Sequence, residues 1–438
     1  MPNAVWDVTS KCNLNCQHCY NLNKYSNSSY SDLSYAECMQ FISFLSENNC
    51  KVLSLLGGEP LLHPNIRDIL LACKQKGIAV VITTNGTLLD DEMISVIMDS
   101  SVTDVLVSLD GSEASVNDAI RGDGVFSMVT NNISRLINAI RESASNISVS
   151  IAYSMTSLNF KSSRDMVMLC KNLRVGRLNI TSIINAGGAN NNWEDMKLDT
   201  FRMLNAIEDL VAYSCEIYPT LSIVVDARPL VAWYLNRKYP ANVTYSLGFT
   251  KCQVLDQLIY VTADGHLHPC GIYDMEIGKE AQRKGFFDSK DTFKIDPTSS
   301  VEDIYASKYY RDFLSSMKQL YKGEYHKNCV DCPVREDCFP CPYQFDDGVA
   351  DCDWVSEKLN QITSDVSCWN VVRKHEVPEK YIPDENLKFL YSMLKTGSTV
   401  AENYACYVKA SNQAIDIFDY LNMLNVLERK FILKTKRG

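Results

Sequence analysis

Three cysteines near the start of the chain, Cys12, Cys16 and Cys19, have a C-x3-C-x2-C spacing that can bind an iron–sulfur cluster. Three thiolates this close together can hold three corners of a cubane cluster, which leaves one iron without a protein ligand. Such an iron can bind a small molecule. A structural zinc site is the competing interpretation, because zinc takes four ligands and His18 could supply the fourth, although it would be cramped.

A second motif follows about 40 residues later, where the apolar run Val52–Leu56 leads into Gly57, Gly58, Glu59 and Pro60. Two glycines let a backbone approach a ligand closely. Their carbonyl groups could accept hydrogen bonds from an ammonium group, and the glutamate adds negative charge. Alone, the motif could equally be a plain strand-to-helix turn. After the cysteine triad, it indicates a ligand site.

Together, the cysteine triad and the Gly-Gly-Glu-Pro motif resemble the radical SAM superfamily. In that family, the open iron chelates the amino and carboxylate groups of S-adenosylmethionine (SAM), and an electron from the cluster cleaves the sulfonium. The resulting 5′-deoxyadenosyl radical abstracts hydrogen from a substrate. The resemblance implies that the cofactor carries out the difficult chemistry while the protein positions it.

The composition predicts a globular protein with room for two or three domains, since 46% of the 438 residues are hydrophobic. A formal net charge of −10 without a long basic run makes nucleic acid a poor candidate partner. We find no run of 18 apolar residues and no signal peptide, so we expect a cytoplasmic protein without a membrane span. In a reducing cytosol, 17 cysteines favour metals or clusters over disulfides.

Strand-like and helix-like segments alternate over the first 200 residues, which predicts an α/β fold with a parallel sheet and right-handed crossovers. Six such units suit the partial (β/α)6, TIM-like barrel of radical SAM proteins. The expected strands are Ala4–Thr9, Val52–Leu56, Ala79–Thr83, Asp104–Leu109, Ile147–Tyr153 and Arg177–Ile184. The expected helices are Tyr35–Glu47, Asn65–Lys76, Asp90–Ser100 and Met128–Glu142.

Polar segments follow several of the expected strands at their carboxyl ends, where parallel α/β folds bind ligands. Each segment alone could be a turn, because Asn-Gly and Asp-Gly are common turn formers. The resemblance implies that Ser108 contacts the SAM ribose, that Arg121 pairs with its carboxylate, and that His18 packs near the adenine. The expected SAM-binding residues are His18, Gly57, Gly58, Glu59, Pro60, Asn85, Ser108, Asp110 and Arg121.

Eight further cysteines lie between residues 252 and 368. Their spacing alone is compatible with two four-cysteine clusters or two zinc sites. Their order resembles the SPASM extension of radical SAM enzymes, which carries two auxiliary 4Fe–4S clusters, although the last step here is C-x2-C instead of C-x3-C. Cys352 either completes the first auxiliary cluster or lies unliganded in an inserted loop. The resemblance implies Cys252, Cys270 and Cys341 for the first cluster and Cys329, Cys332, Cys338 and Cys368 for the second.

The remaining six cysteines mostly fall in apolar patterns, so we expect buried structural thiols at Cys38, Cys50, Cys73, Cys170, Cys215 and Cys406. We predict a radical SAM barrel over residues 1–200, a bridging region over 201–250, a cysteine-rich SPASM domain over 251–375 and a helical C-terminal extension over 376–438. Within the extension, Leu387–Leu394 and Ala414–Leu427 have amphipathic helical patterns.

The leading hypothesis is a SPASM-type radical SAM enzyme that crosslinks, epimerises or oxidises a residue of a ribosomally made peptide or protein. It would need SAM, three 4Fe–4S clusters and an electron donor such as flavodoxin or ferredoxin. Because Cys12 lies so early, we expect no N-terminal leader-binding domain, so a separate protein or the tail would recognise a leader peptide. The same chemistry on a sugar or cofactor precursor and a non-catalytic zinc-binding module are the alternatives. No feature identifies a catalytic acid, base or hydrogen donor.

Overall fold

The computed structural model divides the chain into two compact units, Met1–Tyr325 with Glu336–Gly348, and His326–Arg335 with Val349–Gly438. Each unit is described by itself below. The structure describes residues 3–22, 31–245, 258–268, 271, 293–294, 301–307, 310–311, 315, 332–334, 338, 350–365, 370–373, 382, 385–395, 398–411, 415–429 and 433–436.

The first unit is built on a sheet that has 11 strands among the described residues, in the order β11-β10-β9-β1-β2-β3-β4-β5-β6-β7-β8. All neighbours from β1 to β8 pair in parallel. The strands are β1 (Asn3–Thr9), β2 (Val52–Gly57), β3 (Ala79–Thr84), β4 (Val102–Ser108), β5 (Ser148–Met155), β6 (Arg177–Ser182), β7 (Ser222–Val225), β8 (Asn242–Tyr245), β9 (Ile259–Val261), β10 (His266–His268) and β11 (Phe293–Lys294).

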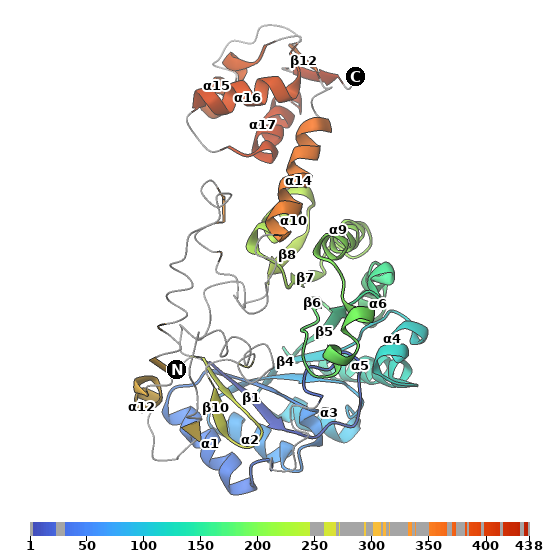
Figure 1. The fold of residues 1–438 in the computed structure, drawn as a ribbon, viewed down its shortest axis with the longest axis vertical. Coiled ribbons are helices and arrows are strands. Elements are labelled where there is room, and N and C mark those ends of the chain that lie inside the picture. Colours follow the sequence, from blue (N-terminus) through green and yellow to red (C-terminus); the bar gives the residue numbers. More distant parts are fainter. Residues whose placement is uncertain are drawn as a thin grey trace. The chain divides into compact units, whose positions relative to one another are not determined.

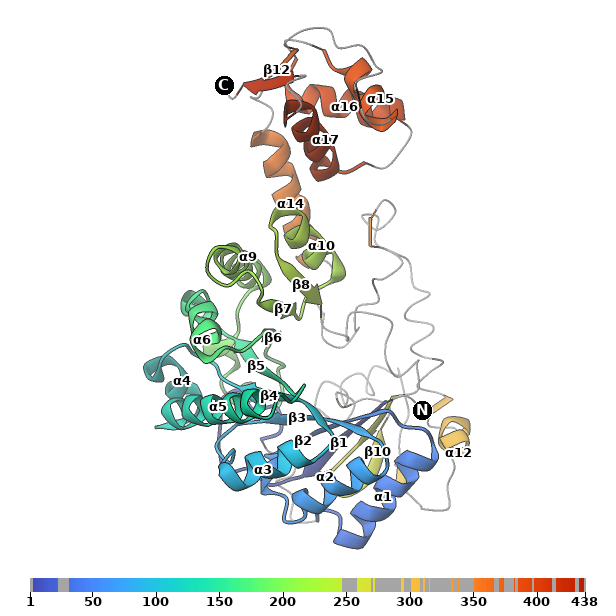
Figure 2. The ribbon, with the colours of Figure 1, turned by 180° about the vertical axis from the view of Figure 1, so that it is seen from behind.

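Helices connect most of these strands and cover the convex face of the sheet (Figures 1 and 2). They are α1 (Tyr35–Glu47), α2 (Ile66–Gln75), α3 (Asp91–Asp99), α4 (Ala114–Arg121), α5 (Val125–Glu142), α6 (Asp165–Leu173), α7 (Gly188–Asn191), α8 (Trp193–Met196), α9 (Thr200–Ile217), α10 (Pro229–Lys238) and α12 (Val301–Ala306). Short 3₁₀ helices lie at η1 (Pro60–Leu62) and η2 (Phe160–Ser162).

The core lies between the convex face of the sheet and these helices. Successive strand residues point to opposite faces, so alternate side chains are buried under the helices. On β1, Trp6 and Val8 are fully buried, and the Trp6 ring meets Phe41 of α1 edge-on at 5.0 Å between centroids. Each such side chain contributes about 1.5–3 kcal/mol of burial. This packing fixes β1, and with it the loop that follows.

The predicted α/β fold with a parallel sheet is confirmed, and the six expected strands correspond to β1–β6. The sheet nevertheless continues past residue 200 through β7 and β8, which at four residues each are too short for a clear alternation pattern. Helix α5 begins three residues earlier than expected. The Asp118 carboxylate accepts hydrogen bonds from the Gly124 and Phe126 amides at 2.9 and 2.7 Å, which holds the start of this helix.

The second unit contains helices around an aromatic cluster. Tyr407 lies 5.5 Å from Phe389 and 5.7 Å from Tyr420 between ring centroids. The two predicted helices are present, and the second starts at Ile417 because Asp416 accepts hydrogen bonds from two amides of its first turn. Helix α16 and the antiparallel strands were not predicted. The elements are α14 (Ala350–Asp365), β12 (Asn370–Arg373), α15 (Glu385–Met393), α16 (Val400–Ser411), α17 (Ile417–Arg429) and β13 (Leu433–Lys436).

Within the described part of the chain, none of the helices has the length and apolar character that crossing a bilayer requires.

Candidate functional site

The cysteine triad lies in the loop that follows β1, at the carboxyl end of the parallel sheet. Cys16 is buried, Cys19 is half-buried and Cys12 is exposed. The loop is a tight turn, because the Cys19 amide donates to the Cys16 carbonyl at 3.2 Å. Three thiols of graded exposure thus line one side of the rim where parallel sheets bind ligands.

Gly57 and Gly58 let the end of β2 contact this loop directly. Gly57 has a φ of +124°, and a Cβ there would come within 2.4 Å of the Thr9 carbonyl oxygen. A Cβ on Gly58 would come within 2.2 Å of the Lys11 carbonyl oxygen. The same backbones are hydrogen-bonded, with the Gly58 amide donating to Thr9 at 2.9 Å. Both glycines therefore allow the cysteine loop to pack directly against the end of β2.

The carboxylate of Glu59 is almost fully buried and holds the end of β3 beside the loop. It accepts hydrogen bonds from the Thr84 hydroxyl at 2.6 Å, the Asn85 amide at 2.7 Å and the Leu61 amide at 3.1 Å. Burial raises the pKa of Glu59, and these hydrogen bonds act in the opposite direction. Pro60 follows as the first residue of η1. The carboxylate thus joins two strand ends.

Asn85 extends from the end of β3 to the cysteine loop. Its Nδ2 donates to Asn13 Oδ1 at 2.8 Å and lies 3.9 Å from the Cys12 sulfur. Burial raises the pKa of Cys12, while hydrogen bonds from the Leu14 amide and Asn85 lower it. Hydrogen bonds to ligand sulfurs stabilise the thiolate and tune the potential of a bound cluster.

A buried group of titratable side chains, Asp110, Arg121 and His18, lies on the other side of the loop. Asp110 Oδ2 is 2.6 Å from Arg121 Nε and 2.7 Å from His18 Nε2, and the three side chains are at most 8% exposed. Burial alone would raise the pKa of Asp110, but the Arg121 charge and His18 hold it well below its usual range. This carboxylate therefore fixes both the Arg121 and the His18 side chain at the rim.

Arg121 also reaches the triad, because its Nη1 lies 3.9 Å from the Cys16 sulfur. Burial raises the pKa of Cys16 to about 11, and the Arg121 charge opposes that shift. His18 Nδ1 is buried and has no hydrogen-bond partner among the described residues. Likewise, the Ser108 hydroxyl forms no hydrogen bond with any of the described residues. Both groups are available to a ligand at the rim.

Two features that hold the loop were missed in the sequence. Asp32 accepts hydrogen bonds from the Thr9 hydroxyl at 2.5 Å and the Ser10 amide at 2.8 Å. Gly187 has a φ of +58°, and a Cβ added there would lie 2.5 Å from the Tyr20 carbonyl oxygen. The second Gly-Gly pair after a strand was the available signal, since it repeats the arrangement at the end of β2.

The triad suits a multi-iron cluster better than a single metal ion. Among the described residues, no three Cys, His, Asp or Glu side chains converge closely enough to hold one ion. A zinc ion about 2.3 Å from each thiolate needs sulfur atoms roughly 4 Å apart. A cubane cluster is bound at separate corners, so the sulfur atoms of its ligands lie farther apart. The glycine cradle, the two donors near sulfur and the unpartnered His18 Nδ1 all fit a cluster with a ligand beside it.

Of the eight cysteines in the second field, the structure describes Cys332, Cys338 and Cys352. Cys352 lies in the first turn of α14 and not in an inserted loop, since the helix begins at Ala350. The assignment of the field to two auxiliary clusters stays a prediction. The other five cysteines lie outside the described residues: Cys252, Cys270, Cys329, Cys341 and Cys368.

Most of the predicted structural thiols are buried as expected, and burial raises the pKa of Cys73 to about 12. The prediction is wrong for Cys406, which is exposed on α16 because that helix buries Asn403 and Tyr407 instead. Cys215 is half-buried on α9. The buried members of this set are Cys38, Cys50, Cys73 and Cys170.

Comparison with known proteins agrees with this geometry. The model of the radical SAM superfamily matches residues 6–155. Mycofactocin maturase MftC of Mycobacterium ulcerans is 32% identical over 135 residues, which cover 31% of this chain and 36% of MftC. The AdoMet-dependent heme synthase of Methanosarcina barkeri is 36% identical over 118 residues, 27% of this chain and 34% of that protein. The match thus spans about a third of the length of these curated relatives.

Among solved structures, SuiB of Streptococcus suis bound to SAM superposes with a TM-score of 0.57 at 16% identity, covering 78% of this chain and 73% of SuiB. A further SuiB structure contains the precursor peptide SuiA. At this identity, the likeness shows the fold. Together with the family match and the loop geometry, it leads to one conclusion: residues 6–155 form a radical SAM domain.

Proposed function

We propose that Cys12, Cys16 and Cys19 bind a 4Fe–4S cluster at which SAM is cleaved reductively, and that the chain modifies a residue of a ribosomally made peptide or protein. When bound there, the cluster and SAM supply a 5′-deoxyadenosyl radical that removes a hydrogen atom from the substrate. The modification would be a crosslink, an epimerisation or an oxidation.

The observation that carries this proposal is the pair of N–H donors beside the triad. Asn85 comes from the end of β3 and lies 3.9 Å from the Cys12 sulfur, and Arg121 comes from α4 and lies 3.9 Å from the Cys16 sulfur. Two segments far apart in the sequence thus place N–H donors beside sulfurs of one loop, where they oppose the effect of burial and favour the thiolate form that a cluster ligand needs. Asp110 orients Arg121, and the glycine pair keeps the loop against β2.

His18 and Ser108 are the groups that we assign to SAM itself. The unpartnered Nδ1 of His18 would contact the adenine, and the Ser108 hydroxyl would contact the ribose. Arg121 already contacts Asp110, so its remaining nitrogen atoms would serve both the Cys16 sulfur and the SAM carboxylate. Gly57 and Gly58 would present backbone atoms to the ammonium group. Each role is a positioning role for a bound cofactor.

A peptide substrate is supported by the polar side chains along the same rim beyond the triad. The hydroxyls of Ser154 and Thr181 lie 3.5 Å apart at the ends of β5 and β6, and the Ser182 hydroxyl donates to the buried Asp226 at 3.3 Å. Such groups suit the amide and side-chain polarity of a peptide. Two of the similar proteins support a peptide substrate as well. MftC is named a maturase. SuiB has been solved with its precursor peptide SuiA.

The remaining parts of the proposal concern the second cysteine field and the partners. Two auxiliary 4Fe–4S clusters there would accept or donate electrons during the modification. A flavodoxin or ferredoxin would reduce the first cluster, and a separate protein would recognise a leader peptide. Iron and sulfide analysis of reconstituted protein tests the cluster count, because three clusters require about 12 iron and 12 sulfide per chain. A value near four would leave the triad as the cluster site.

A small-molecule substrate is the second candidate function, and the heme synthase relative favours it specifically. A cofactor precursor such as a tetrapyrrole would use the same radical chemistry with a different substrate cavity. Mass spectrometry of a co-expressed neighbouring precursor peptide separates the two. A loss of two hydrogens indicates a crosslink or oxidation, and an unchanged mass with altered stereochemistry indicates epimerisation. An unmodified peptide together with a consumed tetrapyrrole would favour the second candidate.

The cofactor chemistry itself is tested by anaerobic reconstitution of the Cys12→Ala/Cys16→Ala/Cys19→Ala variant. We expect the wild type to form 5′-deoxyadenosine from SAM with a strong reductant and the variant to form none. Cys406→Ala is the matched control, because that thiol is exposed in the other unit and should change neither iron content nor SAM cleavage. SAM cleavage that persists in the triple variant would refute the proposed function.

A further inference from the structure

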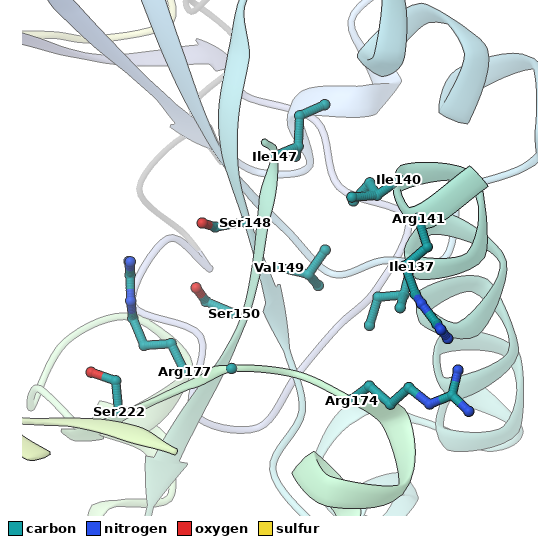
Figure 3. A pocket seen from close by; sticks show the side chains of 11 residues that line it. Ile137, Ile140, Arg141, Ile147, Ser148, Val149, Ser150, Arg174, Arg177 and Ser222 are labelled. Carbon is teal, nitrogen blue, oxygen red and sulfur yellow. The ribbon is translucent and has the colours of Figure 1, made fainter. Parts of the chain in front are cut away.

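A pocket of about 470 Å³ lies at the amino ends of β5, β6 and β7 (Figure 3). Ser148, Arg177 and Ser222, which begin these three strands, all line it. Because the strands are parallel, this edge of the sheet is opposite to the carboxyl ends that carry the cysteine loop. The pocket is therefore separate from the proposed SAM site, and its volume is in the range of small-molecule sites.

The lining combines an apolar wall with positive charge. Ile137 and Ile140 of α5 and Val149 of β5 form the wall, and serine hydroxyls stand on the other side of β5 (Figure 3). Arg141 lies in the last turn of α5, and Arg174 follows the end of α6. Both arginine side chains extend on the side of β5 that faces α5 (Figure 3). An apolar body with an anionic group would match this lining.

The arginines of the pocket differ in their partners. Arg177 donates to Asp104 Oδ2 at 2.6 Å, and the Ser150 hydroxyl donates to Asp104 Oδ1 at 3.0 Å, so the charge of Arg177 is neutralised. Neither Arg141 nor Arg174 forms an ion pair or a side-chain hydrogen bond with any residue that the structure describes. Two exposed arginines on the same side of one pocket give it a positive local charge, which favours binding of an anion.

The backbone of Arg174 gives a second indication. It has a φ of +60° in the left-handed region, where its amide caps α6 by donating to Cys170 and Lys171. Glycine is the residue that this position favours, because a Cβ in a left-handed conformation is strained. The chain thus has a long cationic side chain, in place of a glycine, at the end of α6 beside the pocket.

We propose that this pocket binds a small organic anion, with a phosphate or carboxylate group held between Arg141 and Arg174 and an apolar body against Ile137, Ile140 and Val149. A planar guanidinium donates two parallel hydrogen bonds to either group. The open space beside Gly176, where an added Cβ would meet nothing within 4 Å, leaves an entry at the pocket edge. This inference rests on the pocket alone and not on the proposed radical chemistry.

Calorimetric titration of the full-length reconstituted protein tests the proposal. The probes are 1-naphthyl phosphate, 1-naphthoate and the neutral 1-naphthol. We expect saturable one-to-one binding of at least one anion, weakened by salt, and no comparable binding of the naphthol. The phosphate and carboxylate arms identify the anionic group. Arg141→Gln/Arg174→Gln should weaken binding at least tenfold, whereas Arg135→Gln, on the same helix but outside the pocket, should not change it.

Arg174→Gly separates ligand binding from helix capping. Basic residues near a helix C-terminus also stabilise the helix by their charge, which would make Arg141 and Arg174 purely structural. If the side chain serves an anion, Arg174→Gly should raise or preserve the thermal midpoint and weaken anion binding severalfold. A lowered midpoint with unchanged binding would overturn the proposal. So would a wild type that binds neither anion saturably, or a double variant that binds like Arg135→Gln.

Discussion

The two edges of the parallel sheet differ in whether their arginines have carboxylate partners. At the carboxyl edge, Asp110, Arg121 and His18 are at most 8% exposed, and the Asp110 carboxylate pairs with Arg121 and contacts His18. At the amino edge, Arg141 and Arg174 stand at a pocket without a carboxylate partner among the described residues. Buried charges must be paired because isolated ones are costly to desolvate, whereas exposed ones can stay unpaired until a ligand binds.

This difference indicates different tasks for the two edges. A compensated, buried carboxylate fixes the orientation of its partners, which suits the role proposed for this edge, that of holding a loop of cluster ligands in place. Uncompensated arginines at an open pocket retain their binding capacity for an external anion. Changes at the carboxyl edge should therefore affect folding and cluster retention, and changes at the amino edge should affect ligand binding with little effect on folding.

The largest effect is expected from Asp110→Asn, which leaves the buried Arg121 guanidinium without its carboxylate. Removing one partner of a buried ion pair costs about 3–5 kcal/mol, so the free energy of unfolding of the first unit should fall by that order. Iron content after reconstitution should fall as well, because Arg121 loses its orientation beside Cys16. Urea unfolding and iron analysis measure the two effects.

The pH dependence of the Asp110→Asn difference follows from the lowered pKa of Asp110 in the folded state. The stability that its carboxylate contributes is fully present above the unfolded pKa of about 3.9 and is lost as the pH falls through the folded value. The gap between wild type and variant should therefore be constant near neutral pH and shrink in acid. An unfolding free energy equal to that of the wild type at pH 7 would contradict the compensating role.

The next largest effect is expected from Gly58→Ala at the carboxyl edge. The new Cβ would lie 2.2 Å from the Lys11 carbonyl oxygen, so the cysteine loop must move. Overpacking of this kind costs about 1–3 kcal/mol, and the displaced loop should retain less iron. Gly176→Ala at the amino edge is the matched control, because its Cβ would meet nothing within 4 Å. Equal iron content in both variants would mean that the close approach at Gly58 is not needed to position the cysteine loop.

A smaller effect on stability is expected from Asp104→Asn at the amino edge. Arg177 is 42% exposed in its pair with Asp104, so losing the pair should cost no more than about 1 kcal/mol. The variant frees a third guanidinium at the pocket, and calorimetry should show tighter binding of 1-naphthyl phosphate. Weaker or unchanged binding would show that the charge of Arg177 does not act on the pocket.

Much of the carboxyl edge could be predicted from the sequence because its signals are local. The spacing of Cys12, Cys16 and Cys19 and the strand before Gly57 lie within short windows, and the order of the strands then brings both to one rim. What could not be predicted is how the side chains share partners. His18 meets Asp110 across 92 positions of sequence, and only the packed structure shows that this carboxylate contacts both His18 and Arg121.

The amino edge was not predictable for a related reason. A basic residue near a helix end, such as Arg141 or Arg174, is ordinary in sequence, because it stabilises the helix terminus by charge. Its significance appears when two helix ends meet at one pocket and the nearby carboxylate of Asp104 is already paired with Arg177. Short strands such as β7 and β8, which complete this edge, also lack a readable alternation pattern.

The smallest effect is expected from Arg135→Gln, which tests whether any arginine on α5 would behave like those of the pocket. Arg135 Nε donates to Asp91 at 3.0 Å, and both side chains are substantially exposed. Such surface pairs contribute less than about 1 kcal/mol, so the unfolding free energy should change by no more than about 0.5 kcal/mol. Anion binding should stay at the wild-type value because Arg135 lies outside the pocket. A loss of binding equal to that of the Arg141→Gln/Arg174→Gln variant would mean that net charge, and not the unpaired arginines at the amino edge, attracts the anion.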